Sequence, residues 1–261
     1  MKIRIANLLA LGLLAIAATS LAATPGTDNA NQTVYDDEWA EPDDGAATGD
    51  GFGQWFLTTS ATNTGVAGFF IGDSRNLASG QTGADINVNG ESFGMYAVSG
   101  TNGNASANAY RFFNGTLAAG DTFSLDLAMN FTDNKGFNLR GAGEVTIFNF
   151  NIGSGNYTFG TGNVTTHFSN ANYSSNTAFH LSFTQTDGSG GIWSVNRSGG
   201  ITDGASGTYS GVATSFQLYT YDTGGGSEND LIANRLSVVP EPAATAFLAG
   251  AAAIILIRRR R

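Results

Sequence analysis

Histidine most often moves protons or binds metals near neutral pH, and this chain has only two, His167 and His180. Each falls at an outward-facing position of a predicted strand. A metal site built on both would need carboxylate partners, and the sequence points to none. Cysteine is absent, which excludes disulfides, thiolate catalysis and cysteine-based zinc sites. We therefore expect both histidines to be ordinary surface residues.

Paired carboxylates are the second group that could do chemistry. A retaining glycosidase needs two of them about 5 Å apart, which alternate positions of one strand would supply. Glu91 and Glu144 have no such partner in the sequence, and the odd separation of Asp121 and Asp126 sends them to opposite faces of a strand. No Gly-x-Ser-x-Gly elbow appears where a strand meets a helix. The carboxylate and serine patterns therefore disfavour a hydrolase.

An acidic cluster near the N-terminal end could supply oxygen ligands to a structural calcium ion. Its candidate ligands are Asp36, Asp37, Asp43 and Asp44. The cluster lacks the spacing of an EF-hand loop, and the same residues are good turn formers. Calcium and a solvated acidic loop both stay open, and we expect no other cofactor.

Aromatic side chains could form a platform on which sugar rings stack, and Trp193, Tyr219 and Tyr221 are the candidates. Trp193 and Ile192 are adjacent in a predicted strand, so one of the two should face solvent. Tyr219 and Tyr221 are two residues apart and share one strand face. Ordinary packing is the competing interpretation, because sheets use aromatic residues freely.

The elements that must position these residues are predicted to be short strands. The chain has 36 glycines in 261 residues, about twice the usual ~7% share. Apolar residues alternate strictly over residues 123–131 and again over 179–183, the signature of half-buried strands. In residues 145–152 the apolar phase switches between Ile147 and Phe148, which predicts a bulge. We expect a single antiparallel β-sandwich of the jelly-roll type over residues 54–237, preceded by an acidic segment, 24–53, whose first residues are flexible.

The first 23 residues are typical of a secretory signal peptide. Lys2 and Arg4 precede an apolar run, and small residues place the cleavage site after Ala22, with Ala23 the second choice. An uncleaved N-terminal membrane anchor is the alternative. The sequence thus predicts export from the cytoplasm through the secretion machinery and a signal peptidase.

The C-terminal end has three parts in order. Pro240, Glu241 and Pro242 form an extended hinge, residues 243–257 form an apolar stretch, and a basic cluster closes the chain. At ~1.5 Å per residue a helix of that stretch spans about 22 Å, short of a ~30 Å hydrocarbon core. A transient transmembrane handle therefore fits better than a permanent tail anchor. The basic cluster consists of Arg258, Arg259, Arg260 and Arg261.

This tail, residues 238–261, resembles the PEP-CTERM sorting signal of Gram-negative bacteria. The resemblance implies recognition and cutting at Pro-Glu-Pro by an exosortase-type membrane protease. The same tail is catalogued as an ice-binding protein C-terminal domain, a label that describes the tail and does not show ice binding. The strand texture of the central domain is similar to concanavalin A-like and laminin G-like sandwiches.

The net charge of the chain limits the kinds of molecule that it can bind. The chain has 21 acidic and 12 basic residues. Residues 24–239 contain 20 of the acidic and 6 of the basic residues, so the net charge of this part is −14. Nucleic acid is excluded as a partner because it needs a basic face. We expect a non-enzymatic protein at the cell surface or in the extracellular matrix, membrane-associated until its tail is processed. Exopolysaccharide is its expected glycan partner. The alternative is a secreted polysaccharide-acting hydrolase with a concanavalin-like fold.

Overall fold

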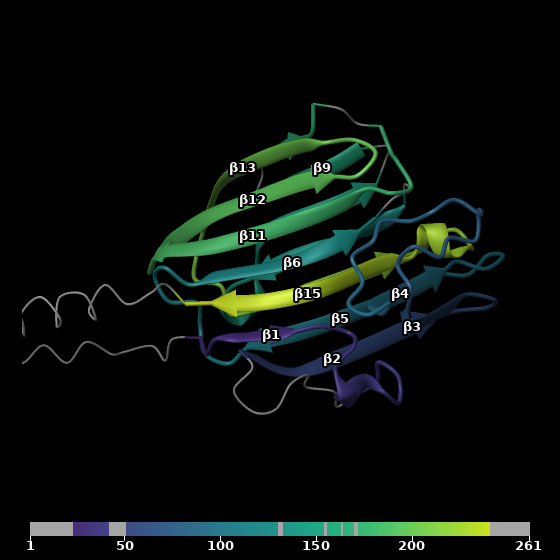
Figure 1. Cartoon of the computed structure of the whole chain (residues 1–261), viewed down its shortest axis with the longest axis horizontal. Coiled ribbons are helices and arrows are strands. Elements are labelled where there is room, and N and C mark those ends of the chain that lie inside the picture. Colours follow the sequence, from purple (N-terminus) through teal and green to yellow (C-terminus); the bar gives the residue numbers. More distant parts are fainter. Residues whose placement is uncertain are drawn as a thin grey trace, which may run out of the picture.

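Two antiparallel β-sheets pack face to face in the computed structural model, which describes residues 23–41, 51–129, 133–153, 156–162, 164–169 and 172–240 (Figure 1). The expected antiparallel β-sandwich is confirmed. In the described residues three short 3₁₀ helices lie between strands, and the helices expected for the signal peptide and for residues 243–257 fall outside these residues. The 3₁₀ helices are η1 (Thr33–Tyr35), η2 (Ala142–Glu144) and η3 (Ser227–Asn229).

The eight-stranded sheet faces the viewer in Figure 1, with β13, β12, β11, β6 and β15 following one another from the top. The short strand β1 pairs with the C-terminal half of β15, beyond the point where the pairing of β15 with β4 stops. In spatial order the strands are β13 (Asp203–Ser210), β12 (Gly190–Ser198), β11 (Ala178–Asp187), β6 (Thr122–Ala128), β15 (Leu231–Val239), β4 (Ser92–Val98) and β3 (Val66–Gly72), with β1 (Gly26–Asp28) beside β15.

The seven-stranded sheet lies behind it and has β14 near its centre. Its outward face is directed away from the eight-stranded sheet and carries the candidate site described below. In spatial order its strands are β10 (Val164–His167), β9 (Asn156–Thr161), β8 (Thr146–Gly153), β7 (Asn134–Arg140), β14 (Ser215–Tyr221), β5 (Ala105–Phe113) and β2 (Phe52–Ala61).

The core between the sheets is dominated by stacked phenylalanines. Phe123 of β6 stacks on Phe216 of β14 at a centroid distance of 4.9 Å, and Phe137 of β7 stacks on Phe183 of β11 at 5.3 Å. All four are fully buried, and each contributes about 1.5–3 kcal/mol by leaving water. The alternation that predicted these strands thus points their apolar side chains at the opposite sheet.

The bulge predicted in residues 145–152 is confirmed. Leu139 of β7 pairs with Phe148 of β8, while the next residue, Arg140, pairs with Thr146. Ile147 is therefore the extra residue. Because it has no partner in β7, the alternation of inward and outward side chains in β8 shifts by one position there.

The N-terminal segment is a fixed part of the sandwich, which corrects the expectation that its first residues are flexible. Asp28 of β1 is buried, where its carboxylate accepts hydrogen bonds from the Arg111 guanidinium of β5 and from the Tyr35 hydroxyl, the latter at 2.8 Å. The Trp55 indole N–H donates to the same hydroxyl at 3.0 Å. We call Asp28, Tyr35, Trp55 and Arg111 the N-terminal latch.

The latch explains why the sequence misleads here. An aspartate in an acidic stretch is usually solvated, but its counter-charge comes from a strand 83 residues away in the chain. The Arg111 guanidinium also packs over the rings of Phe52 and Trp55, 4.9 and 4.8 Å from their centroids. The sandwich accordingly begins at β1 and ends at Val239 of β15, beyond the expected bounds of 54 and 237.

Candidate functional site: the outward face of the seven-stranded sheet

Strand β14 shows how the candidate site forms. Phe216 and Leu218 point into the core and are fully buried, so Gln217 and Tyr219 point outward, together with Tyr221. The neighbouring strands repeat the pattern with asparagine at their outward positions. We call this surface the amide face. It consists of Asn108, Asn138, Asn149, Asn151, Gln217, Tyr219 and Tyr221.

Three of these amides lie in one row across the sheet. Asn149 of β8 pairs in register with Asn138 of β7, which pairs with Gln217 of β14. The Asn149 side-chain amide donates to Asn138 Oδ1 at 2.7 Å, and the Asn138 amide donates to Gln217 Oε1 at 3.0 Å. The Gln217 amide donates in turn to Asn108 Oδ1 at 2.8 Å and to the Tyr110 hydroxyl at 3.1 Å. The row therefore fixes the orientation of each amide.

Both tyrosines of β14 join this network. The Tyr219 hydroxyl accepts from the amides of Asn149 and Asn151 at 3.0 and 2.8 Å, and the Tyr221 hydroxyl donates to Asn108 Oδ1 at 2.9 Å. Burial raises the pKa of Tyr219, so its phenol stays neutral at physiological pH. The amide face is thus an uncharged array of donors and acceptors held in place by its own hydrogen bonds.

Gly136 of β7 makes room for the ring of Tyr219. The two residues are register partners, and a Cβ at Gly136 would lie 2.7 Å from the Tyr219 hydroxyl oxygen and in collision with the backbone oxygen of Phe150. The missing side chain lets the ring lie across β7 toward β8. Only 7% of Tyr219 is exposed as a result.

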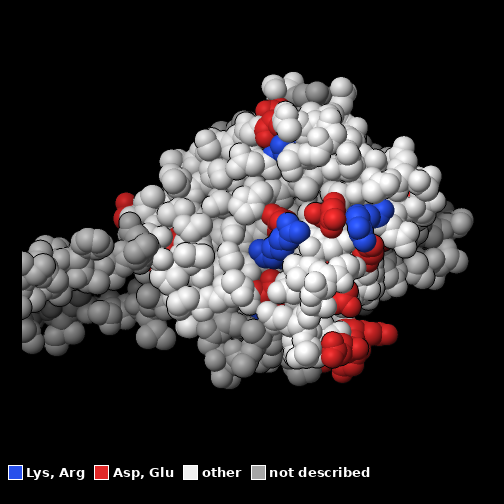
Figure 2. All heavy atoms as spheres, in the orientation of Figure 1, with Lys and Arg blue, Asp and Glu red and all other residues white. Residues whose placement is uncertain are grey.

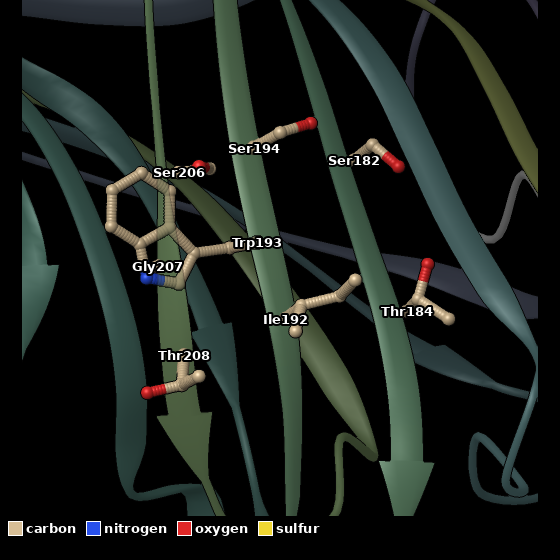
Figure 3. Close-up of a pocket in the computed structure, with 8 residues that line it drawn as sticks. All are labelled: Ser182, Thr184, Ile192, Trp193, Ser194, Ser206, Gly207 and Thr208. Atoms are coloured by element: carbon tan, nitrogen blue, oxygen red, sulfur yellow. The ribbon is translucent and has the colours of Figure 1, made fainter.

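A pocket of about 240 Å³ adjoins the amide face. We call it the aromatic pocket. It is not the pocket drawn in Figure 3, which lies on the eight-stranded sheet. Phe56 and Phe112 stand at its rim, 41% and 39% exposed, with their rings perpendicular at a centroid distance of 6.0 Å. The pocket is lined by Phe56, Tyr110, Phe112, Arg140, Glu144 and Ser215.

An ion pair forms the polar wall of the aromatic pocket. Arg140 Nη2 lies 3.1 Å from a Glu144 carboxylate oxygen, and Arg140 Nε donates to the Glu144 backbone oxygen at 2.9 Å. The guanidinium also stacks on the Tyr110 ring, 5.1 Å from its centroid. Its charge is therefore largely neutralised before any ligand arrives.

The outward face of the eight-stranded sheet has a different character. Pairing aligns five serines across five strands, with a second row of threonines and apolar residues beside them. Figure 2, which views this face, shows few charged atoms over β12 and β13 and small groups of both signs nearby. We call it the serine–threonine face, after Thr122, Ser124, Ser182, Thr184, Ser194, Ser206, Thr208 and Ser237.

Two of the three sugar-stacking candidates are corrected, because Tyr219, 7% exposed, and Trp193 are both buried. Trp193 is not an exposed stacking residue. Its side chain is 5% exposed and packs against Phe148 and Phe159 of the opposite sheet, while Ile192 is 50% exposed. Figure 3 shows Trp193 leaving β12 on the side opposite to Ile192 and Ser194. Its indole lies against Gly207, its register partner in β13, where a Cβ would be 2.7 Å from the ring. The missing side chain leaves room for the buried indole.

The predicted calcium ligands are only partly described. Asp36 and Asp37 are exposed, and Asp43 and Asp44 lie outside the described residues. Within the part of the chain that the structure describes, no group of three or more histidine or acidic side chains is placed to hold a metal ion.

The histidines and isolated carboxylates also find places. His167 is exposed, and His180 Nδ1 lies 2.8 Å from the Asp126 carboxylate, which also pairs with Arg235 at 3.2 Å. The hydrogen bond to Asp126 raises the pKa of His180 above its usual 6.5. Glu91 precedes β4 of the eight-stranded sheet, and Glu144 follows β7 of the seven-stranded sheet. The two carboxylates therefore do not lie on paired strands.

The ends of the described chain lie near each other. Ala23 is buried and its N–H donates to the Thr116 oxygen at 2.8 Å, while Pro240 follows β15, the strand that pairs with β1. Ala22, Glu241, Pro242 and the terminal arginines lie outside the described residues. In the described ranges no helix is long and apolar enough to cross a membrane.

Sequence reasoning missed most of the amide face and the whole aromatic pocket. A usable signal was present in β8, where Asn149 and Asn151 occupy alternate positions although asparagine is depleted in strands. The partners of these residues come from β7, β14 and β5. Strand β7 directly precedes β8, but β14 and β5 are distant in the chain, so only the register of the folded sheet reveals the whole row.

No family model and no curated protein matches this chain. Among solved structures it is similar to the receptor binding domain of botulinum neurotoxin D, with TM-score 0.37 and 11% identity over 67% of this chain and 44% of that one. The binding domain of Paraclostridial Mosquitocidal Protein 1 has a TM-score of 0.39 and 10% identity, over 85% of this chain and 49% of that one. A family 11 carbohydrate-binding module of a Clostridium thermocellum cellulosomal cellulase has a TM-score of 0.25 and 8% identity, over 70% of this chain and 87% of that one.

The chain thus spans less than half the length of the two toxin chains. Likeness at this level carries no functional argument. The function proposed next rests on the amide face alone.

Proposed function

We propose that this protein is a non-enzymatic, exported β-sandwich that binds glycan on its amide face. The observation that carries the proposal is the continuous row of hydrogen-bonded side-chain amides across β8, β7 and β14. A sugar offers hydroxyl groups that both donate and accept hydrogen bonds. Side-chain amides offer both functions in one planar group, with four hydrogen-bonding positions each. The bonds within the row use only part of this capacity.

Preorganisation supports the proposal further. A flexible polar side chain loses about 0.5–1.5 kcal/mol of entropy when a ligand immobilises it. The bonds of Asn138, Asn149 and Gln217 to one another remove much of that cost before binding. The aromatic pocket adds an apolar surface beside the polar row, the combination typical of ligand sites.

The absence of charge within the amide face favours a neutral ligand. Its seven members are amides and phenols, and the nearest ion pair described above, Arg140 with Glu144, is internally neutralised. A neutral polysaccharide fits such a surface, and the central domain's net negative charge disfavours polyanions.

A non-enzymatic role follows from the carboxylates. Hydrolysis by the usual two-carboxylate mechanism needs a pair about 5–9.5 Å apart on one face. Glu144 stands at the amide face, bonded to Arg140, and its neighbours on this face are amides, phenols and phenylalanines. The secreted hydrolase is the second candidate, and no observation on the structure favours it.

A glycan array combined with a reducing-sugar assay tests the function. We expect the purified chain to retain glycans and to release no reducing sugar. Asn138→Ala should weaken retention, and Asn196→Ala, the matched change at an exposed position of β12 on the other sheet, should not. Sugar release that disappears in Glu144→Gln would establish the hydrolase instead.

Export and tail processing complete the proposal and are supported by the two terminal segments of the sequence. We expect mass spectrometry of surface protein to show loss of the first 22 residues and a new C-terminus at Pro240, Glu241 or Pro242. Surface-exposed protein that retains Arg261 would contradict the sorting role.

A further inference from the structure

One polar atom beside the amide face has no partner. Ser215 is 2% exposed, and its Oγ makes no hydrogen bond in the described part of the chain. The residue nevertheless lines the aromatic pocket. A buried hydroxyl without a partner costs free energy, so such groups are rare in folded proteins. A ligand group that entered the pocket and bonded to Ser215 would remove this cost.

The walls of the pocket define the chemistry of that group. Phe56 and Phe112 offer exposed rings in a perpendicular pair, which suits a small apolar group such as a methyl. The stacked guanidinium of Arg140 presents N–H groups on the wall formed with Tyr110, and these suit a carbonyl oxygen. The occupant should therefore carry a methyl and a carbonyl close together.

The size of the pocket limits the occupant further. Its volume of about 240 Å³ is below the ~300–1,000 Å³ of sites that enclose a whole small molecule. A single substituent of a sugar, with part of its ring, fits this space. The rest of the glycan then lies outside the pocket, on the adjoining amide face.

Charge decides between a carbonyl that is neutral and one that belongs to a carboxylate. Glu144 lines the pocket beside Arg140, and their ion pair leaves the wall close to neutral. A uronate carboxylate would meet the negative charge of Glu144 at short range. An acetamido group carries the same carbonyl without charge and adds the methyl that the phenylalanines suit.

We propose that the aromatic pocket is a subsite for the acetamido group of an N-acetylhexosamine. The inference rests on the proposed glycan-binding function and names its ligand class. The acetamido methyl packs against Phe56 and Phe112, and its carbonyl accepts from Ser215 and Arg140. Sugars with a hydroxyl in place of the acetamido group lack both the carbonyl and the methyl that packs against Phe56 and Phe112.

Ligand-observed NMR with saturation of the protein tests the subsite. The probes are the methyl glycosides of N-acetylglucosamine and N-acetylgalactosamine, each compared with the parent hexoside. We expect the acetyl methyl protons to receive the strongest saturation and the N-acetyl sugars to bind about tenfold more tightly, the effect of one hydrogen bond and one buried methyl. Ser215→Ala and Phe112→Ala should each reduce this preference.

The controls separate the subsite from the function. Ile192→Ala, an exposed apolar residue on the serine–threonine face, should leave the preference unchanged, and thermal unfolding of each variant confirms its fold. Glycan binding on the array without an N-acetyl preference would overturn the subsite and leave the function standing. Stronger binding of methyl glucuronoside would overturn it in favour of a carboxylate. No binding to any glycan would overturn both.

Discussion

The two outward faces of the sandwich are built from the same kind of strand but from different side chains. The amide face carries long planar polar groups that bond to one another across strands. The serine–threonine face carries short hydroxyls, which bond in separate pairs: Ser124 with Ser237 and Thr122 with Thr184, each at 2.8 Å. A short hydroxyl offers little surface and little reach, whereas a fixed amide projects donors and acceptors at defined positions. The contrast is the reason why the proposed recognition is assigned to the amide face.

Removing the N-terminal latch should have the largest effect and should not distinguish the faces. Asp28→Asn keeps the shape of the side chain but removes the negative charge that bonds to the buried Arg111 guanidinium, at a cost of about 3–5 kcal/mol. Chemical denaturation measures the loss. Asp126→Asn, which affects ion pairs partly exposed on the other sheet, should cost less than about 1 kcal/mol. Equal losses in the two variants would refute the structural role of the latch.

A glycine on each face sharpens the contrast next. Gly136→Ala should destabilise the sandwich by about 1–3 kcal/mol and displace Tyr219, because the new Cβ collides with the Phe150 backbone. In Gly204→Ala the nearest atom is an Asn196 side-chain oxygen at 3.1 Å, which can move. Thermal unfolding distinguishes the two, and similar melting temperatures would show that the position of Gly136 tolerates a side chain.

Matched asparagine changes compare recognition directly. Asn138→Ala removes the central link of the row, so we expect glycan affinity to fall about tenfold, or ~1.4 kcal/mol. Asn196→Ala on the other face should change affinity by less than about twofold. Isothermal titration with a glycan selected by the array gives both numbers. A comparable loss from the two variants would erase the proposed difference between the faces.

The smallest expected effect is a pH dependence, which should be seen at His180 on the eight-stranded sheet and not in glycan binding on the amide face. His180 titrates on the eight-stranded sheet, and its pKa is raised by Asp126. A raised pKa means that this pair stabilises the fold at low pH, and the contribution is lost as pH rises through the folded-state pKa. NMR titration of the His180 ring should give a pKa above 6.5 that falls in Asp126→Asn. Glycan binding by the amide face should stay constant across the same pH range.

Local patterns in the sequence were enough to predict the strands but not their partners. The alternation of Phe123, Leu125 and Leu127 predicted β6, and the phase change at Ile147 predicted the bulge of β8. The sequence left open which of Ile192 and Trp193 is buried, and the folded sheet places Trp193 inward beside Gly207 of the next strand. The start of the acidic segment was expected to be flexible because Arg111, the partner of Asp28, is distant in the chain. The amide row was not predicted because the register that aligns β8, β7 and β14 is a property of the folded sheet.

The most direct test of the account follows the side-chain NH₂ signals of asparagine and glutamine by NMR while an array-selected glycan is added. Binding at the amide face predicts shifts at Asn138, Asn149 and Gln217, and unchanged signals at Asn196 on the opposite face. Shifts confined to Asn196, or none at all when the glycan is bound, would contradict the assignment of recognition to the amide face.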